Sequence, residues 1–131
     1  MLRLRRLALV LFLGAAALAA CDRYGDDIDA VKVADSVVPG KSNEVLTLDI
    51  AGARGTVEWH GEEAPQYQSP EIVAVIATIK RIGATGIRHQ IDLDFVHNRQ
   101  TKKVAFDGAL LDGKKQDLVS GAMSLFLMQL E

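Results

Sequence analysis

The sequence has one cysteine, few aromatic residues and no recognisable nucleophile or phosphate-binding motif. A lone cysteine cannot form an internal disulfide, so the hydrophobic core must stabilise the fold. Aromatic residues make up only 5% of the chain, which disfavours a sugar-binding platform. The Gly-x-Ser-x-Gly elbow and the Gly-rich phosphate loop are both absent. From these absences we expect no enzyme activity and no bound cofactor.

The sequence also lacks an apolar run long enough to span a membrane. Fourteen uncharged residues run from Leu7 to Ala20, whereas a spanning helix needs about 20. Three arginines precede this run, and charged residues follow it closely. A basic start, a short apolar stretch and then small residues are typical of an export signal.

The tetrapeptide Leu18-Ala19-Ala20-Cys21 resembles the lipobox of bacterial lipoproteins at every position. The resemblance implies that residues 1–20 are a signal peptide cut before Cys21, and that the Cys21 thiol carries a diacylglyceryl group. Two or three acyl chains hold a protein durably on a membrane, because each buried CH₂ contributes about 0.8 kcal/mol. The alternative is an ordinary secretory signal cut near Ala20, which would leave Cys21 as a free thiol. Asp22 resembles the enterobacterial signal for inner-membrane retention, so we expect the periplasmic side of the inner membrane rather than the outer membrane.

The charge balance after Cys21 is acidic. Without Arg3, Arg5 and Arg6, 12 of the 15 basic residues remain against 17 acidic ones, a net charge near −5. Nucleic-acid binding depends on basic surfaces that release counterions, so we expect no nucleic-acid partner. The same balance disfavours a polybasic grip on anionic lipid.

We expect residues 21–30 to be a lipidated polar tether and residues 31–131 to be one small domain. Ala30–Val38 precedes the turn signal Pro39-Gly40 and is interpreted as a short strand. Residues 42–52 fit either a helix capped by Ser42 or Asn43 and ended by Gly52, or a strand with alternating Leu46, Leu48 and Ile50. We favour the helix.

A series of β-strands fills the middle of the chain. The second strand, Glu71–Arg81, has apolar residues on both faces, which predicts that it is central and covered on both sides. The third, Ile87–His97, alternates strictly, as a half-buried antiparallel strand does. The expected segments are strands at Thr56–His60, Glu71–Arg81, Ile87–His97 and Lys103–Ala109, a loop at Gly61–Pro70 and a hairpin turn at Gly83–Gly86.

Asp117–Leu130 has the periodicity of an amphipathic helix that would pack across the sheet. The expected fold is therefore α+β: an antiparallel meander of three to four strands with this C-terminal helix and one further helix on one face. The segments Pro39–Ser42, Val57–Trp59 and Val73–Ala77 resemble those of small bacterial lipoprotein domains of unknown function. That resemblance implies no particular activity. The first element of those domains is a helix, whereas we expect a strand in this chain.

Three histidines and several carboxylates could suggest a metal site. On one strand, however, His89 and His97 are about 27 Å apart, at roughly 3.3 Å per residue, so they cannot share an ion. Only His60 and Glu62 could share a face within reach of one another. We expect no metal site, with His89 and His97 at the two ends of the buried face.

Asp92 and Asp94 lie on one strand face about 6 to 7 Å apart, a separation that glycosidase carboxylates also use. A solvated outer face, with Arg88 or Lys103 as ion-pair partners across the hairpin, is the simpler interpretation.

Trp59 and Tyr67 flank the acidic Gly61–Pro70 loop and are the candidate binding residues, although Trp59 also fits a core position. Our hypothesis is a non-enzymatic envelope lipoprotein, attached to the membrane through Cys21, whose domain binds another envelope protein or supports an assembly. The alternative is a periplasmic lipoprotein that binds a small ligand or a metal in a pocket between the sheet and the Gly61–Pro70 loop.

Overall fold

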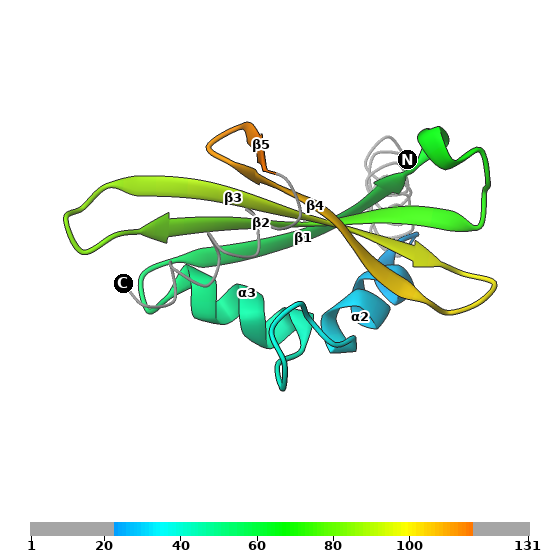
Figure 1. The fold of residues 1–131 in the computed structure, drawn as a ribbon, viewed down its shortest axis with the longest axis horizontal. Coiled ribbons are helices and arrows are strands. Elements are labelled where there is room, and N and C mark those ends of the chain that lie inside the picture. The colour runs from blue at the N-terminus through cyan, green and yellow to red at the C-terminus, as the bar shows by residue number, and fades with distance from the viewer. Residues whose placement is uncertain (1–22, 117–131) are drawn as a thin grey trace, which may run out of the picture.

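Two short helices precede a five-stranded antiparallel sheet in the computed structural model, which describes residues 23–116 (Figure 1). The strands follow one another in the order β1-β2-β3-β4-β5, so the sheet is a simple meander. The α+β class and the meander are as predicted. The elements are α2 (Gly25–Val33), α3 (Asn43–Ala51), β1 (Thr56–Glu63), the 3-10 turn η1 (Pro65–Tyr67), β2 (Ile72–Ile82), β3 (Arg88–Asn98), β4 (Val104–Leu111) and β5 (Lys114–Gln116).

The helix α2 corrects the prediction of a strand at Ala30–Val38 and of a tether reaching residue 30. Acidic Asp26 and Asp27 lie in its first turn and Lys32 in its last, which suits the helix dipole. Val31 is fully buried against the sheet. The polar residues from Gly25 to Asp29, which suggested a tether, are therefore the first turns of a packed helix.

The helix α3 confirms the favoured reading of residues 42–52. The Ser42 hydroxyl accepts a hydrogen bond from the Val45 amide, which satisfies one of the free N–H groups of the first turn. Gly52 ends the helix at φ 70°, a left-handed conformation that glycine adopts without strain. Leu46 and Ile50 are buried against the sheet.

The central hairpin has the predicted position, and the residues of β3 alternate between the core and the outer face as predicted. β2 and β3 pair along their full length, with Val75 opposite Phe95. The turn between them closes through a hydrogen bond from the Gly83 amide to the Ile87 carbonyl. β1 is longer than expected, because it continues through Glu63 into the segment predicted as a loop.

The last two strands extend beyond the prediction. β4 continues to Leu111, and a bulge interrupts its pairing with β3 between Asp94 and Phe95. Asp112 and Gly113, both at positive φ, then turn the chain into the short β5. An Asp-Gly pair is a recognised hairpin signal, so this strand was predictable from the sequence.

The core lies between the two helices and one face of the sheet. In Figure 1 both helices lie below the sheet, whereas η1 lies above it. The prediction that β2 is covered on both sides is therefore wrong for the described residues: Val75 and Ile79 are fully buried, but Ile76 on the other face is only half-buried. The expected helix at Asp117–Leu130 lies outside the described residues.

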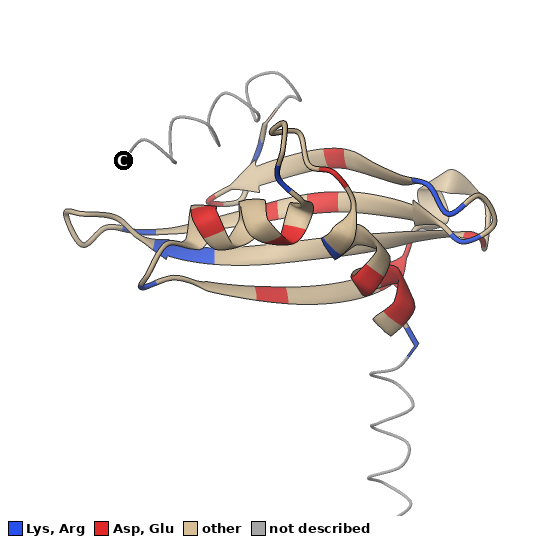
Figure 2. Cartoon of the chain, turned by 90° about the horizontal axis from the view of Figure 1, so that it is seen from below, with Lys and Arg blue, Asp and Glu red and all other residues tan. Residues whose placement is uncertain are grey.

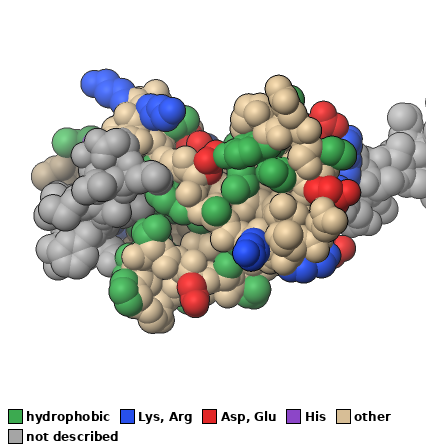
Figure 3. Space-filling view, turned by 45° about the vertical axis from the view of Figure 1, so that its right-hand side comes forward, with side chains coloured by type: hydrophobic (Ala, Val, Ile, Leu, Met, Phe, Trp, Pro, Cys, Tyr) green, Lys and Arg blue, Asp and Glu red, His purple; other side chains and the backbone are tan. Residues whose placement is uncertain are grey.

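Apolar side chains also reach the surface. Figure 3 shows them gathered in the middle of one face, with charged side chains nearby. The exposed large apolar side chains of the helical layer are Val33, Val37, Val45 and Leu48.

Among residues 23–116 no helix has the length and apolar character needed to cross a membrane.

Candidate functional site

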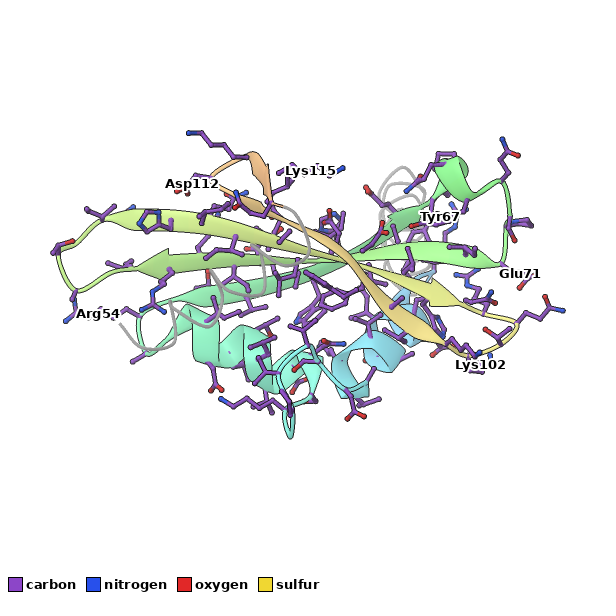
Figure 4. All side chains as sticks on the ribbon, in the orientation of Figure 1. Arg54, Tyr67, Glu71, Lys102, Asp112 and Lys115 are labelled. Atoms are coloured by element: carbon purple, nitrogen blue, oxygen red, sulfur yellow. The ribbon has the colours of Figure 1, made fainter. Side chains whose placement is uncertain are left out.

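The two predicted binding aromatics lie on opposite faces of the sheet. Trp59 packs against the core, with its ring 6.1 Å from that of Phe95 and the Lys32 ammonium 5.8 Å above it. Tyr67 lies on the side away from the helices (Figure 4), where its hydroxyl donates to Asp107 at 2.7 Å. Tyr67 remains 37% exposed. The structure therefore does not bring these two residues together, and Tyr67 is the more exposed of the two.

The histidines are dispersed, as the spacing predicted. His97 is buried at one end of the core face of β3, and His89 is half-exposed at the other end, 2.7 Å from Asp112. His60 faces outward from β1. Among residues 23–116 no three His, Cys, Asp or Glu side chains gather as metal ligands do. Cys21 lies outside the described residues.

Asp92 and Asp94 share the outer face of β3, as predicted, but their expected ion pairs with Arg88 and Lys103 do not form. Asp92 instead accepts hydrogen bonds from the Thr78 hydroxyl at 2.8 Å and from the side-chain amide of Gln90. Asp94 is half-buried rather than solvated. Burial, followed by the charges of Asp92, Asp107 and Glu62, raises the pKa of Asp94 above its ordinary value.

A buried ion cluster made of Asp27, His97 and Arg99 ties α2 to the end of β3. We call it the Asp27 cluster. Asp27 is 2% exposed, and its carboxylate lies 2.7 Å from Nδ1 of His97. Arg99 donates to the same carboxylate from Nη2 at 2.7 Å and from Nε at 3.1 Å, which is the bidentate geometry that a guanidinium favours. One carboxylate on a helix is therefore held by one partner from β3 and one from the turn that follows it.

Opposing effects act on the ionisation of Asp27. Burial alone would raise the pKa of the Asp27 carboxyl, but the hydrogen bonds and charges of Arg99 and His97 outweigh burial and lower it. The pKa of Arg99 is raised, chiefly by its hydrogen bond to Asp27. Both directions favour the charged pair, so the cluster strengthens the attachment of α2 near neutral pH.

The imidazole of His97 uses one nitrogen in this cluster. Nδ1 meets Asp27, while Nε2 is buried and has no hydrogen-bond partner among the described residues. A carboxylate on Nδ1 orients an imidazole as it does in hydrolytic triads. Neither ring nitrogen of His97 meets a hydroxyl or thiol within residues 23–116, so the described residues offer this pair no nucleophile.

The first described residues are clamped onto the sheet beside the Asp27 cluster. Tyr24 rests on Gly61, where a Cβ would lie 2.4 Å from the Tyr24 Cβ, closer than side chains approach. The guanidinium carbons of Arg23 and Arg99 lie 5.2 and 6.0 Å from the Tyr24 ring centre, within the range of cation–π attraction. Arg99 also donates to the Arg23 carbonyl at 3.2 Å. A strand glycine thus makes room for the aromatic residue that begins the fold.

A hollow of about 450 Å³ lies between this clamp and the loop after β1. Its walls include Tyr24 and Arg99 on one side and Pro65, Ser69 and Pro70 on the other. The walls mix one aromatic ring, proline rings and polar groups, as small-ligand sites do. It occupies the place where the sequence suggested a pocket, between the sheet and the Gly61–Pro70 loop.

Neither similarity to known proteins nor residue spacing identifies these features. Comparison with protein-family models, with curated proteins and with solved structures found no match to this chain. Asp27 and His97 are 70 residues apart in the sequence, so no local pattern connects them. Only the buried position of His97 on β3 was predictable, from the strict alternation of that strand.

Proposed function

We propose that this chain is a non-enzymatic envelope lipoprotein, anchored through lipid on Cys21 and held close to the periplasmic face of the inner membrane. The observation that carries the proposal is the short interval between the lipobox cysteine and the start of the fold. Three residues separate Cys21 from α2. The Cα atoms of Cys21 and Tyr24 can be at most about 11 Å apart, given 3.8 Å per residue.

The clamp at Tyr24 supports a fixed position for the domain. Because Tyr24 packs on Gly61, and Asp27 binds His97 and Arg99, the chain is attached to the sheet within a few residues of Cys21. The end of the sheet that carries these residues would face the headgroups, and the β2–β3 hairpin would point away.

The surface that we assign to a protein partner is the loop that carries Tyr67. Its ring is exposed on the side of the sheet away from the helices, and its hydroxyl is already fixed by Asp107. A pre-oriented aromatic side chain is a typical anchor of a protein–protein contact, because little conformational entropy is lost on binding.

Two experiments test the proposal. Cys21→Ser should abolish incorporation of labelled fatty acid and release the protein from membranes washed at high salt. A photo-crosslinking residue at Tyr67 should give a defined adduct in membranes, whereas one at Ile87, which is also exposed, should not. Unchanged membrane retention of Cys21→Ser would refute the anchor. Equal or absent adducts from both positions would refute the contact surface.

The small-ligand alternative is supported by the hollow beside Pro65. If it holds a ligand, a bulky substitution such as Ser69→Trp should displace a small molecule that co-purifies with the wild-type protein, without releasing the protein from the membrane. Mass spectrometry of the wild-type protein under non-denaturing conditions detects that molecule. Its absence from the wild-type protein would remove this alternative.

A further inference from the structure

A second hollow, of about 420 Å³, lies at the other end of the sheet from the Tyr24 clamp. Its walls come from three connections that are distant in sequence: the turn before β1, the β2–β3 hairpin and the turn before β5. In Figure 4 Arg54 and Asp112, from the first and last of these, lie at the left, whereas Lys102 lies at the right. Since β2 has 11 residues, the two ends are about 30 Å apart, at roughly 3.3 Å per residue. The lining residues are Arg54, Thr56, Lys80, Arg81, Ile82, Arg88, His89, Gln90 and Asp112.

The charge of this hollow opposes that of the chain. Four Lys and Arg residues and one Asp line it, although acidic residues outnumber basic ones in the whole sequence. Figure 2 shows blue segments at this end, beside the β2–β3 hairpin. A concentration of cations against the overall sign is not a consequence of composition, and it creates a local positive potential.

The single carboxylate does not neutralise these cations. The Asp112 carboxylate accepts a hydrogen bond from the backbone amide of Gln90 at 2.8 Å and lies 2.7 Å from Nδ1 of His89. Among the ion pairs described for residues 23–116, none involves any of the four cations. Arg81 is different: it points to the helical face of the sheet, where its guanidinium donates to the Ile50 carbonyl of α3 at 2.9 Å.

The paired strands hold the cations close to one another. Lys80 lies opposite Thr56 on β1 and Gln90 on β3, on the face of the sheet away from the helices. Arg88 faces Ile82 at the start of the hairpin. Like charges held together in this way repel one another, and a bound anion relieves that repulsion. Guanidinium groups suit oxyanions in particular, because their N–H groups match phosphate and carboxylate oxygens two at a time.

We propose that this hollow binds a soluble ligand through a multivalent oxyanion, either a phosphate group or clustered carboxylates. Arg54, Lys80 and Arg88, which are all exposed, supply the charge. The site goes beyond the proposed function, and it does not depend on the lipid anchor.

The test is calorimetric titration of the full chain in detergent at an ionic strength of 0.15 M, with pyrophosphate and citrate as probes. Saturable binding of pyrophosphate is expected, and Arg54→Gln/Arg88→Gln should raise its Kd at least about tenfold, since hydrogen bonds to charged groups are strong. Citrate that binds as tightly as pyrophosphate would assign the site to carboxylates. Weaker citrate binding would assign it to phosphate.

The matched control is Lys102→Gln/Lys103→Gln, which makes the same change in net charge at the other end of the sheet. This variant should bind pyrophosphate as the wild type does and keep the wild-type melting temperature, whereas the melting temperature of Arg54→Gln/Arg88→Gln should equal or exceed it. Equal weakening by the two double variants would show that only net charge matters, and would overturn the proposal. So would a failure of both probes to bind saturably, or binding to phosphatidylglycerol vesicles that pyrophosphate does not displace.

Discussion

The carboxylate of Asp27 and the imidazole of His97 lie 2.7 Å apart in the interior, although 70 residues separate them in the chain. The contact joins the first helix to the far end of the third strand, and Arg99 completes it from the solvent side. Both partners of the close contact are almost fully buried. Their interaction therefore connects the start of the fold to its central hairpin.

Asp27→Asn should strongly destabilise the protein. The substitution keeps the shape of the side chain but leaves Arg99 and His97 without the carboxylate that they share. Breaking a buried ion pair from one side costs about 3 kcal/mol. Denaturant unfolding measures the loss. Asp26→Asn, in the same helical turn but exposed, is the control and should change stability by less than about 0.5 kcal/mol.

The contribution of Asp27 to stability should disappear in acid. Because the pKa of Asp27 is lowered on folding, the unfolded chain takes up a proton first as the pH falls. The contribution is therefore complete above the unfolded pKa of about 3.9 and is lost as the pH falls below it through the folded pKa. The stability difference between wild type and Asp27→Asn should be present at pH 7 and shrink below about pH 4. A difference that persists undiminished at pH 2 would contradict this account of the cluster.

Asp94→Asn should stabilise the protein at neutral pH. Burial and the neighbouring carboxylates raise the pKa of Asp94, so its ionised form is unfavourable in the folded state. Removing a like charge from a sheet face contributes up to about 1 kcal/mol. Thermal unfolding at pH 7 should show the gain, which should fall towards zero below the unfolded pKa, where the wild-type residue is protonated in both states. Glu58→Gln, on the outer face of β1, is the control. A loss of stability at pH 7 would be the contrary result.

Gly61→Ala should displace Tyr24 from the sheet. The added methyl group would lie 2.4 Å from the Tyr24 Cβ, so either the strand or the start of α2 must move. Overpacking of this kind costs about 1 to 3 kcal/mol. Denaturant unfolding measures the cost, and faster proteolysis between residues 22 and 28 would report the displacement of α2. Gly83→Ala, where the added Cβ meets its nearest neighbour at an ordinary 3.5 Å, should be nearly neutral.

The sequence predicted those elements whose signals are local. The cap at Ser42, the stop at Gly52 and the alternation along β3 each depend on residues within one element, and all three are as expected. The acidic first turn of α2 is compatible with a helix start, but the helix was missed because the burial of Asp27 depends on His97 and Arg99, far along the chain. Its sequence resembles a solvated tether until those partners are known.

The candidate sites divide in the same way. The resemblance to a lipobox around Cys21 rests on contiguous residues and is visible in the sequence, whereas the Asp27 cluster and the cationic hollow assemble from distant segments. Arg54, Lys80 and Arg88 look like ordinary surface charges in the sequence. Only the pairing of β1, β2 and β3 brings them to one end of the sheet. No pattern of spacing would have grouped them.

The docking of Tyr24 on Gly61 has a mechanical consequence. If Cys21 is embedded in a bilayer, a pull on the β2–β3 hairpin is transmitted to the lipid through the aromatic ring and the buried carboxylate rather than absorbed by a slack linker. Tension along the strands would then load the start of α2 first, so that helix is the expected point of failure under force.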